Sequence, residues 1–229
     1  MRQRWSPNAD DRPAGCAVDT LILHYTGMPT AAAALDRLCD PGAEVSAHYL
    51  IDEDGSIVQL VPEERRAWHA GVSSWQGRAR LNDCSIGIEL VNPGHEWGYR
   101  PFTEAQYDAC MAMCQRLLAH WRIPPGRVLA HSDVAPARKQ DPGELFDWPR
   151  LAAAGIGLWP PPGAGAPRSV GQLQSELARL GYGVAPSGRL DEATRLVIMA
   201  FQRHFRPARV DGRPDRATLA RLDGLLALM

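Results

Sequence analysis

The first half of the chain contains apolar runs of strand length that are separated by polar turns. The longest run is residues 17–25, and two shorter runs follow at residues 47–51 and 56–61. Asp54 and Gly55 lie between the two shorter runs and supply turn chemistry typical of a β-hairpin. The pattern predicts one buried strand and, further along the chain, an antiparallel pair.

Residues 85–91 form a strand-length segment with alternating character. Ile86, Ile88 and Leu90 mark one face of the predicted strand, and Glu89 points to the other. A carboxylate in the middle of a strand is unfavourable by propensity, so Glu89 calls for a functional explanation.

Helical periodicity appears between and after these strands, at residues 30–39, 103–121 and 147–154. Thr103 and Gln106 have the spacing of a capping box at the start of the longest helix. Because strands and helices alternate and one hairpin is present, we expect an α/β (α+β) fold with a mixed sheet flanked by helices.

The composition changes after residue 154. Residues 155–168 are rich in Pro and Gly and read as a semi-rigid linker. The remaining residues, 169–229, predict a small all-α domain of three helices, in which residues 187–194 and 210–218 are a weak internal repeat. We therefore divide the chain into a domain at 1–154, this linker and the three-helix domain.

Composition restricts the possible functions. Apolar residues make up 45% of the chain and the formal net charge is −1, so a core is available but a basic surface for nucleic acid is not. No segment has the roughly 20 consecutive apolar residues that a membrane span needs. We expect a monomer with no nucleic-acid partner and no membrane span.

The five cysteines are odd in number, and Cys110 and Cys114 are one helical turn apart within an apolar stripe. This arrangement predicts reduced, buried thiols. Residues 1–11 lack the apolar core of a secretory signal, which favours the cytoplasm, with the periplasm or cell envelope as the alternative.

Residues 130–143 contain the candidate chemistry. His131, Lys139 and Asp141 lie in one loop after a short apolar run, and His24 ends the longest strand. A catalytic zinc usually takes three protein ligands and leaves a fourth position open, so we predict His24, His131 and Asp141 as the ligands. In this hypothesis Glu89 is the general base and Lys139 stabilises the oxyanion, which gives an amide hydrolase.

The remaining polar and aromatic residues are less diagnostic. His48 and His69 fit either simple packing or substrate contact, whereas we interpret His95, His120 and His204 as surface groups. Candidate substrate contacts are His48, Trp68, His69, Trp75 and Asn82.

The candidate residues lie in segments that resemble, in order, the motifs of the type 2 N-acetylmuramoyl-L-alanine amidases. The segments are Leu23-His24-Tyr25-Thr26 and residues 46–51, 67–71, 82–89 and 131–143. These amidases are zinc enzymes related in fold to peptidoglycan recognition proteins and to a phage lysozyme. The resemblance implies cleavage of the amide between N-acetylmuramic acid, including its 1,6-anhydro form, and L-alanine in muropeptides or peptidoglycan. It also implies the ligand set and the roles of Glu89 and Lys139 given above.

The tail resembles the three-helix peptidoglycan-binding module, which in this family often accompanies exported enzymes. Two alternatives stay open from the residues alone. One is a non-catalytic peptidoglycan-binding sensor, since recognition proteins of this fold can lose zinc. The other is a zinc peptidase that cuts within the stem peptide.

Overall fold

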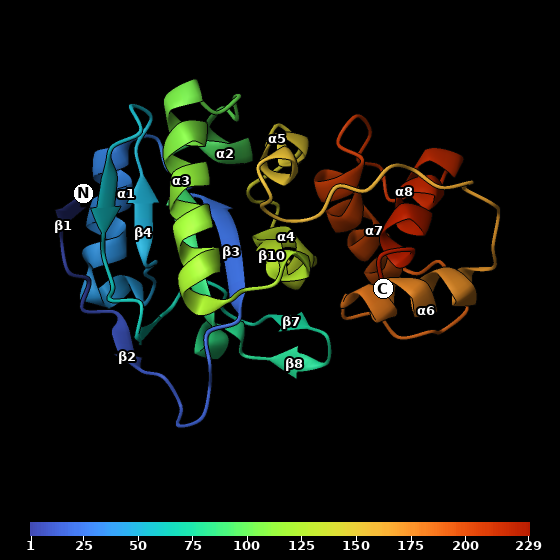
Figure 1. The fold of residues 1–229 in the computed structure, drawn as a ribbon, viewed down its shortest axis with the longest axis horizontal. Coiled ribbons are helices and arrows are strands. Elements are labelled where there is room, and N and C mark those ends of the chain that lie inside the picture. The colour runs from blue at the N-terminus through green and yellow to red at the C-terminus, as the bar shows by residue number, and fades with distance from the viewer.

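The computed structural model describes residues 1–229 as a larger N-terminal lobe and a smaller helical C-terminal lobe (Figure 1). A six-stranded sheet forms the centre of the larger lobe, in the order β1-β5-β4-β9-β3-β10. The hairpin pair β4 and β5 is antiparallel, and all other neighbours are parallel. The strands are β1 (Arg2–Gln3), β3 (Thr20–Tyr25), β4 (Tyr49–Ile51), β5 (Ile57–Gln59), β9 (Ser85–Leu90) and β10 (Val128–Ala130).

Two short antiparallel pairs and eight α-helices complete the chain. The pairs are β2 (Ala9–Asp11) with β6 (Arg65–Ala67), and β7 (Ser74–Trp75) with β8 (Arg78–Ala79). The helices are α1 (Ala31–Cys39), α2 (Gly94–Trp97), α3 (Glu104–Trp121), α4 (His131–Val134), α5 (Trp148–Ala153), α6 (Val170–Leu180), α7 (Glu192–Phe205) and α8 (Arg216–Leu226). The predicted fold class, a mixed sheet flanked by helices with a three-helix tail, is confirmed.

Alternation along the central strands divides the sheet into two faces. Leu21 and Leu23 of β3 pack with Ile86 and Ile88 of β9 against α3. Ile22 lies on the opposite face, in a cluster that extends into the C-terminal helices. The second face is the one that carries the polar side chains of β3 and β9, so it is the face on which a site can form.

The helix ends follow the predicted capping chemistry. Thr103 and Gln106 form both hydrogen bonds of a capping box at α3, and Ser169 and Gln172 do the same at α6. Side-chain oxygens of these residues satisfy backbone N–H groups that the first turn leaves without a partner. The predicted start of α3 is confirmed, and α6 begins with the same motif.

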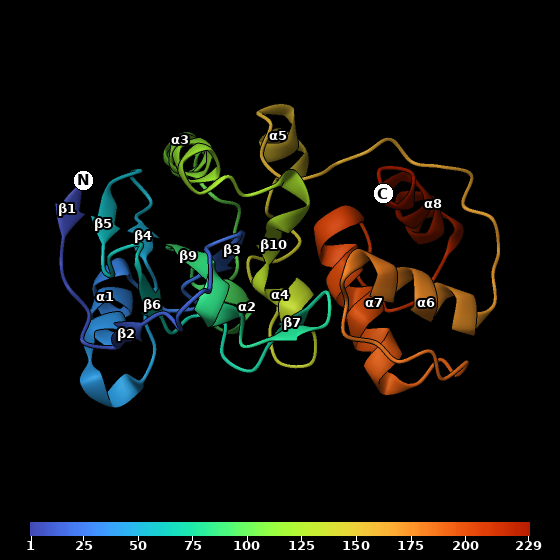
Figure 2. The ribbon, with the colours of Figure 1, turned by 60° about the horizontal axis from the view of Figure 1, so that its bottom comes forward.

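The C-terminal helices share a hydrophobic core with the larger lobe. Leu173 and Phe201 of the helices lie in the same buried cluster as Trp75 and Val134. Figures 1 and 2 both show α7 beside α4. The two lobes are therefore joined by packed side chains as well as by the chain that connects them.

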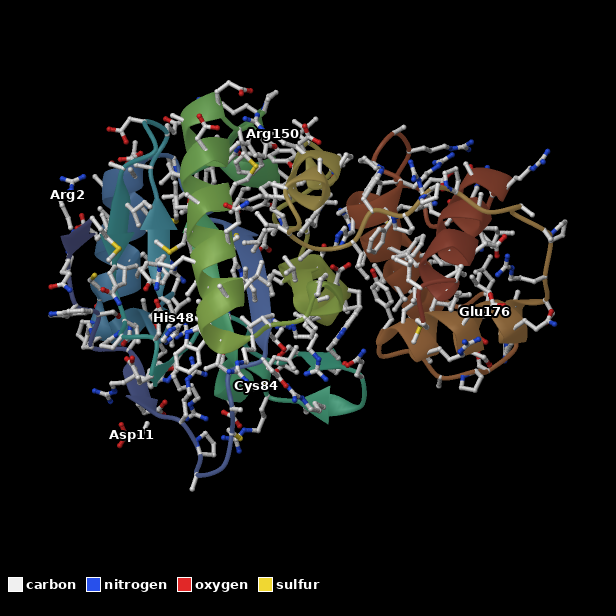
Figure 3. All side chains as sticks on the ribbon, in the orientation of Figure 1. Arg2, Asp11, His48, Cys84, Arg150 and Glu176 are labelled. Carbon is white, nitrogen blue, oxygen red and sulfur yellow. The ribbon has the colours of Figure 1, made fainter.

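The connecting chain, residues 155–168, is held along α8. The N–H of Gly163 donates to the carbonyl of Ala220 over 2.7 Å, and the guanidinium of Arg168 binds the carboxylates of both Glu176 and Asp223. Glu176 is on α6, at the far side of the smaller lobe (Figure 3). No helix of the structure is both long enough and apolar enough to cross a membrane.

Candidate active site

Two histidines and one aspartate meet on the polar face of the sheet. His24 is near the end of β3, His131 is the first residue of α4, and Asp141 lies in the loop that follows. Nδ1 of His24 is 2.9 Å from Nδ1 of His131, and the Oδ2 atom of Asp141 is 3.0 and 2.9 Å from these two nitrogens. All three side chains are buried. The structure thus brings together the three predicted ligands.

The triangle of atoms fits a metal ion better than a hydrogen-bond network. Two neutral imidazoles could each donate to Asp141, but their two Nδ1 atoms could not then satisfy each other at 2.9 Å. Tetrahedral zinc with bonds of about 2.0–2.1 Å places its ligand atoms about 3.3 Å apart, close to the separations seen here. The donor set of two imidazoles and one carboxylate is also one that zinc prefers.

The outer nitrogens of both imidazoles are hydrogen-bonded in a way that leaves Nδ1 free to bind a metal. Nε2 of His24 donates to Nδ1 of His69 over 3.0 Å, and Nε2 of His69 is 3.1 Å from the hydroxyl of Ser85. Nε2 of His131 donates to the carbonyl of Ala70 over 3.2 Å. Such outer contacts fix the tautomer and the ring orientation of metal-binding histidines.

A glycine in the middle of β9 makes room for one of these rings. A Cβ atom at Gly87 would lie 2.5 Å from Cγ of His69, closer than real carbon atoms approach. The absence of a side chain at Gly87 therefore lets the ring of His69 lie against the β9 backbone, where it hydrogen-bonds to His24.

Burial and charge keep these groups in the protonation states that metal binding requires. Burial, together with the neighbouring His131, lowers the pKa of His24 to about 4, so this imidazole is neutral at pH 7. Burial alone would raise the pKa of Asp141, but its electrostatic interactions and hydrogen bonds with the imidazoles of His131 and His24 hold it below its ordinary value. Asp141 is consequently a carboxylate at neutral pH.

Glu89 lies beside this cluster. It pairs with His24 across the parallel ladder between β9 and β3, so both side chains project from the same face. Its Oε2 atom is buried without a hydrogen-bond partner. Burial and the negative charge of Asp141 raise the pKa of Glu89 well above its ordinary value, which Lys139 partly counteracts. Glu89 is therefore a buried carboxyl group able to exchange a proton.

The cluster opens into a cavity of about 610 Å³ between α1 and the loop that carries Lys139 and Asp141. Glu89, His69 and His131 form its inner wall. Its rim has three basic side chains, which are Arg37 of α1 and the consecutive Arg138 and Lys139. The volume lies in the range of small-molecule binding sites.

The other predicted substrate contacts have different surroundings. Only His69 lines the cavity. His48 is fully buried in the larger lobe (Figure 3), where its Nδ1 accepts the N–H of Gly87. The Oδ1 atom of Asn82 accepts the N–H groups of His69 and Ala70, so Asn82 shapes the loop that supports the histidines.

The two tryptophans also lie outside the cavity lining. Nε1 of Trp68 donates to Asp10 over 3.2 Å. Trp75 is buried and packs edge to face on Tyr182, with ring centroids 4.9 Å apart. As a large apolar side chain at the junction of the lobes, Trp75 contributes packing there.

The sequence-based interpretation of His204 as a surface group is wrong. His204 is 2% exposed, and its Nδ1 donates to the carboxylate of Asp133 over 2.6 Å. The local sequence could not predict this contact, because it joins α7 in the smaller lobe to α4 in the larger lobe. All five cysteines are free, and Cys110 and Cys114 are buried as predicted. Cys84 is also buried, whereas Cys39 is partly exposed and Cys16 is exposed.

Comparisons with known proteins agree with this geometry. The family described as N-acetylmuramoyl-L-alanine amidase matches residues 14–144, and the peptidoglycan binding domain matches residues 167–222. More than half of the chain thus matches the amidase family. The fold and the site define a hydrolase, and the chain belongs to the N-acetylmuramoyl-L-alanine amidase family.

Individual relatives extend the match over nearly the whole chain. N-acetylmuramoyl-L-alanine amidase AmiD of Escherichia coli is 42% identical over 231 residues, which cover 91% of this chain and 82% of AmiD. Its complex with anhydro-N-acetylmuramic acid-L-Ala-D-gamma-Glu-L-Lys has a TM-score of 0.83 at 39% identity, covering 95% of this chain and 92% of that one.

AMPDH3 of Pseudomonas aeruginosa, in complex with anhydromuramic pentapeptide, also has a TM-score of 0.83, at 32% identity over 98% of both chains. AmpD of Enterobacter cloacae, a 1,6-anhydro-N-acetylmuramyl-L-alanine amidase, is 39% identical over 65% of this chain and 86% of its own length. The protein is therefore an enzyme that hydrolyses the amide between N-acetylmuramic acid and L-alanine. The predicted activity is confirmed over the alternative of a non-catalytic sensor.

Proposed function

We propose that this amidase is zinc-dependent, with His24, His131 and Asp141 as the metal ligands. The observation that carries the proposal is the triangle of two Nδ1 atoms and one carboxylate oxygen, each 2.9–3.0 Å from the others. The hydrogen bonds made by Nε2 of His24 and Nε2 of His131 leave the Nδ1 lone pairs of both rings free to bind one ion.

Zinc at this site would supply Lewis-acid activation of water and of the amide carbonyl. Glu89 takes the proton from the attacking water and passes it to the leaving amine of L-alanine, which suits a buried carboxyl group with a raised pKa. Lys139, on the cavity wall, provides positive charge for the oxygen that becomes negative in the transition state.

We propose soluble muropeptides as the preferred substrates, including those that end in 1,6-anhydro-N-acetylmuramic acid. AmiD and AMPDH3 were solved with ligands of this kind, and AmpD is named for it. The basic rim formed by Arg37 and Arg138 suits the carboxylates of a stem peptide.

We assign the chemistry to residues 1–154 and peptidoglycan binding to residues 169–229, joined by residues 155–168. The family match over residues 167–222 supports the second assignment. A monomer remains our prediction. The cytoplasm likewise remains the predicted compartment, with the periplasm or envelope as the alternative, and cell fractionation would distinguish them.

The proposal is tested by removing and restoring the metal. The purified enzyme is treated with dipicolinate, dialysed, and supplied with zinc or with magnesium. It is then incubated with a defined anhydro-muropeptide tetrapeptide and, separately, with intact sacculi, and the products are identified by mass spectrometry.

We expect activity to be lost on chelation and restored by one equivalent of zinc but not by magnesium. The expected products are the free tetrapeptide and the anhydro sugar. Full activity of the metal-free protein would overturn the proposed cofactor. Fragments cut between amino acids would instead identify a peptidase acting within the stem.

A further inference from the structure

A buried carboxylate at the junction of the lobes receives hydrogen bonds from the C-terminal module, residues 169–229. Asp133 of α4 is fully buried. Its Oδ1 atom accepts the hydroxyl of Tyr182 over 2.6 Å, and its Oδ2 atom accepts Nδ1 of His204 over 2.6 Å. Removing these donors would leave a buried charge short of partners, which is unfavourable.

The same carboxylate is tied to the backbone that holds a proposed metal ligand. Its Oδ2 atom accepts the N–H of Ala130, the residue before His131, over 2.8 Å. The N–H of Ser132, the residue after His131, donates to the carbonyl of Asp141 over 3.0 Å. The positions of Asp133, His131 and Asp141 are therefore coupled through short hydrogen bonds.

Helix α7 also reaches the other end of the ligand loop. Arg203, which is 8% exposed, donates from Nη2 to the side-chain oxygen of Gln140 over 3.2 Å. Its Nε atom is 3.9 Å from the carboxylate of Glu144. Gln140 precedes Asp141 and Glu144 follows it, so Arg203 contacts the loop on both sides of this ligand.

The donors from the module are themselves fixed. The imidazole of His204 is stacked between Trp148 of the larger lobe and Phe205, with ring centroids 3.8 Å away on each side. Burial and the charge of Asp133 keep the pKa of Tyr182 well above its ordinary value, so its hydroxyl stays protonated and can donate. Neither donor can leave Asp133 without disturbing aromatic packing.

We propose that the C-terminal module completes the metal centre, with Tyr182, His204 and Arg203 as positioning residues for His131 and Asp141. This role is separate from any binding of cell wall by the same module. It rests on the proposed zinc site, because it concerns how tightly that site holds its ion. Outer hydrogen-bond partners of metal ligands typically contribute 10–100-fold to metal affinity.

The test compares zinc affinity in folded, full-length variants. Tyr182→Phe combined with His204→Phe removes both donors and keeps aromatic side chains at both positions. Zinc affinity is measured by competition with a chromophoric chelator, and the ligand geometry by the visible spectrum of the cobalt(II)-substituted protein. Tyr182 and His204 act on the ligands through Asp133 and the backbone. We therefore expect zinc affinity to fall by about 10-fold, the lower end of that range, and the cobalt bands to shift.

Two further variants separate positioning from general destabilisation. Gln202→Met removes hydrogen bonds of a buried side chain on the same helix, but those bonds run to the 211–218 turn inside the module. It should lower the melting temperature and leave zinc affinity and the cobalt spectrum unchanged. Tyr182→Phe combined with His204→Asn retains an N–H donor close to the position of Nδ1. This variant should bind zinc more tightly than the one in which both residues are replaced by Phe.

Wild-type zinc affinity and an unshifted cobalt spectrum in the double variant would overturn the inference. If the double variant does not fold, the single variant Tyr182→Phe is used instead, because it deletes only one oxygen atom. Wild-type zinc affinity in Tyr182→Phe would then overturn the inference. Failure of the wild-type protein to bind zinc would instead refute the proposed function, so the two outcomes are distinguishable.

Discussion

Glu89 and His24 occupy paired positions on the neighbouring parallel strands β9 and β3. The pairing puts a carboxyl group without a hydrogen-bond partner next to an imidazole whose inner nitrogen faces Asp141. Since successive side chains of a strand alternate between faces, apolar neighbours of both residues lie in the core behind them. Adjacent residues of each strand therefore face opposite sides of the sheet, one side being the hydrophobic core and the other the polar site.

Glu89→Gln should retain zinc and lose most turnover. The amide is nearly isosteric but cannot accept a proton, and general acid–base catalysis typically contributes 10²–10⁴-fold. Release of peptide from an anhydro-muropeptide, measured by chromatography, should fall by about that factor, while zinc content stays at one per chain. Glu96→Gln, at the rim of the same cavity, is the matched control and should stay within a few-fold of wild type. Near-normal turnover of Glu89→Gln would remove Glu89 from the mechanism.

Asp141→Ala should release the metal. The substitution removes one corner of the ligand triangle and leaves two imidazoles, so zinc affinity should fall by on the order of 100-fold or more. Zinc content after dialysis, measured by atomic absorption, checks this result. Glu96→Gln is the control, because this exposed carboxyl group lines the same cavity and is not part of the ligand cluster. A zinc-replete Asp141→Ala protein would contradict the ligand assignment.

Gly87→Ala should destabilise the protein and weaken the site together. The added methyl would overlap the ring of His69, and overpacking of this kind typically costs about 1–3 kcal/mol. For a chain of this size each kcal/mol lowers the melting temperature by about 2–4 °C. Displacement of His69 from His24 should lower zinc affinity as well. Gly126→Ala, where the nearest atom is 3.6 Å from the new Cβ, should change neither quantity.

Glu63 should make stability depend on acidity. Burial alone would raise the pKa of Glu63, but hydrogen bonds from Tyr49, Arg116 and Trp121 hold it below its ordinary value. A lowered folded-state pKa gives stability that is present above the unfolded pKa of about 4.3 and lost as the pH falls through the folded value.

Glu63→Gln should therefore be less stable at pH 7, by about 1–3 kcal/mol, and should lose less stability between pH 5 and pH 3. Urea unfolding at a series of pH values measures both effects. Glu64→Gln, at the neighbouring exposed position, should follow the wild-type curve. Parallel curves for Glu63→Gln and wild type would show that Glu63 does not titrate differently in the folded state.

Ending the chain at Arg168 should reduce the stability of the larger lobe. The truncation would expose Val134 and Trp75, which lie in the cluster shared with the module. A module that only bound the cell wall would give a different outcome, in which retention on sacculi falls while the stability of the larger lobe and the hydrolysis of a soluble muropeptide do not. Calorimetry of the truncated protein, together with both binding and turnover assays, compares the two outcomes. An unchanged melting temperature would favour the second.

The sequence predicted the elements whose signals are local. Capping boxes, the Asp54-Gly55 turn and the alternation around Glu89 depend on neighbours within a few residues, and the structure reproduces them. Short edge strands such as β1 and β2 were missed because their partners, β5 and β6, lie far along the chain. Such pairing leaves little trace in a run of two or three residues.

The candidate site shows the same division. His24, His131 and Asp141 could be named because each follows a strand or lies in a recognisable loop. The surroundings of Asp133, Tyr182 and His204 could not, since their contacts join segments about 50 to 70 residues apart. The contact of Trp75 with Tyr182 could not be predicted for the same reason, as an aromatic residue in a loop is equally typical of a binding surface and of an interface between lobes.

The connecting chain, residues 155–168, restricts how this enzyme could be re-engineered. Arg168 forms ion pairs with Glu176 and Asp223, and Gly163 hydrogen-bonds to Ala220, so the connecting chain has a defined path along α8. A foreign wall-binding module spliced in at this point would have to reproduce those anchors as well as the face of α7 that meets the catalytic lobe. Replacing the whole module by an unrelated one should therefore give poorly folded hybrid proteins. Grafting new loops onto the outer surface of α6 and α8 would preserve the contacts between the lobes.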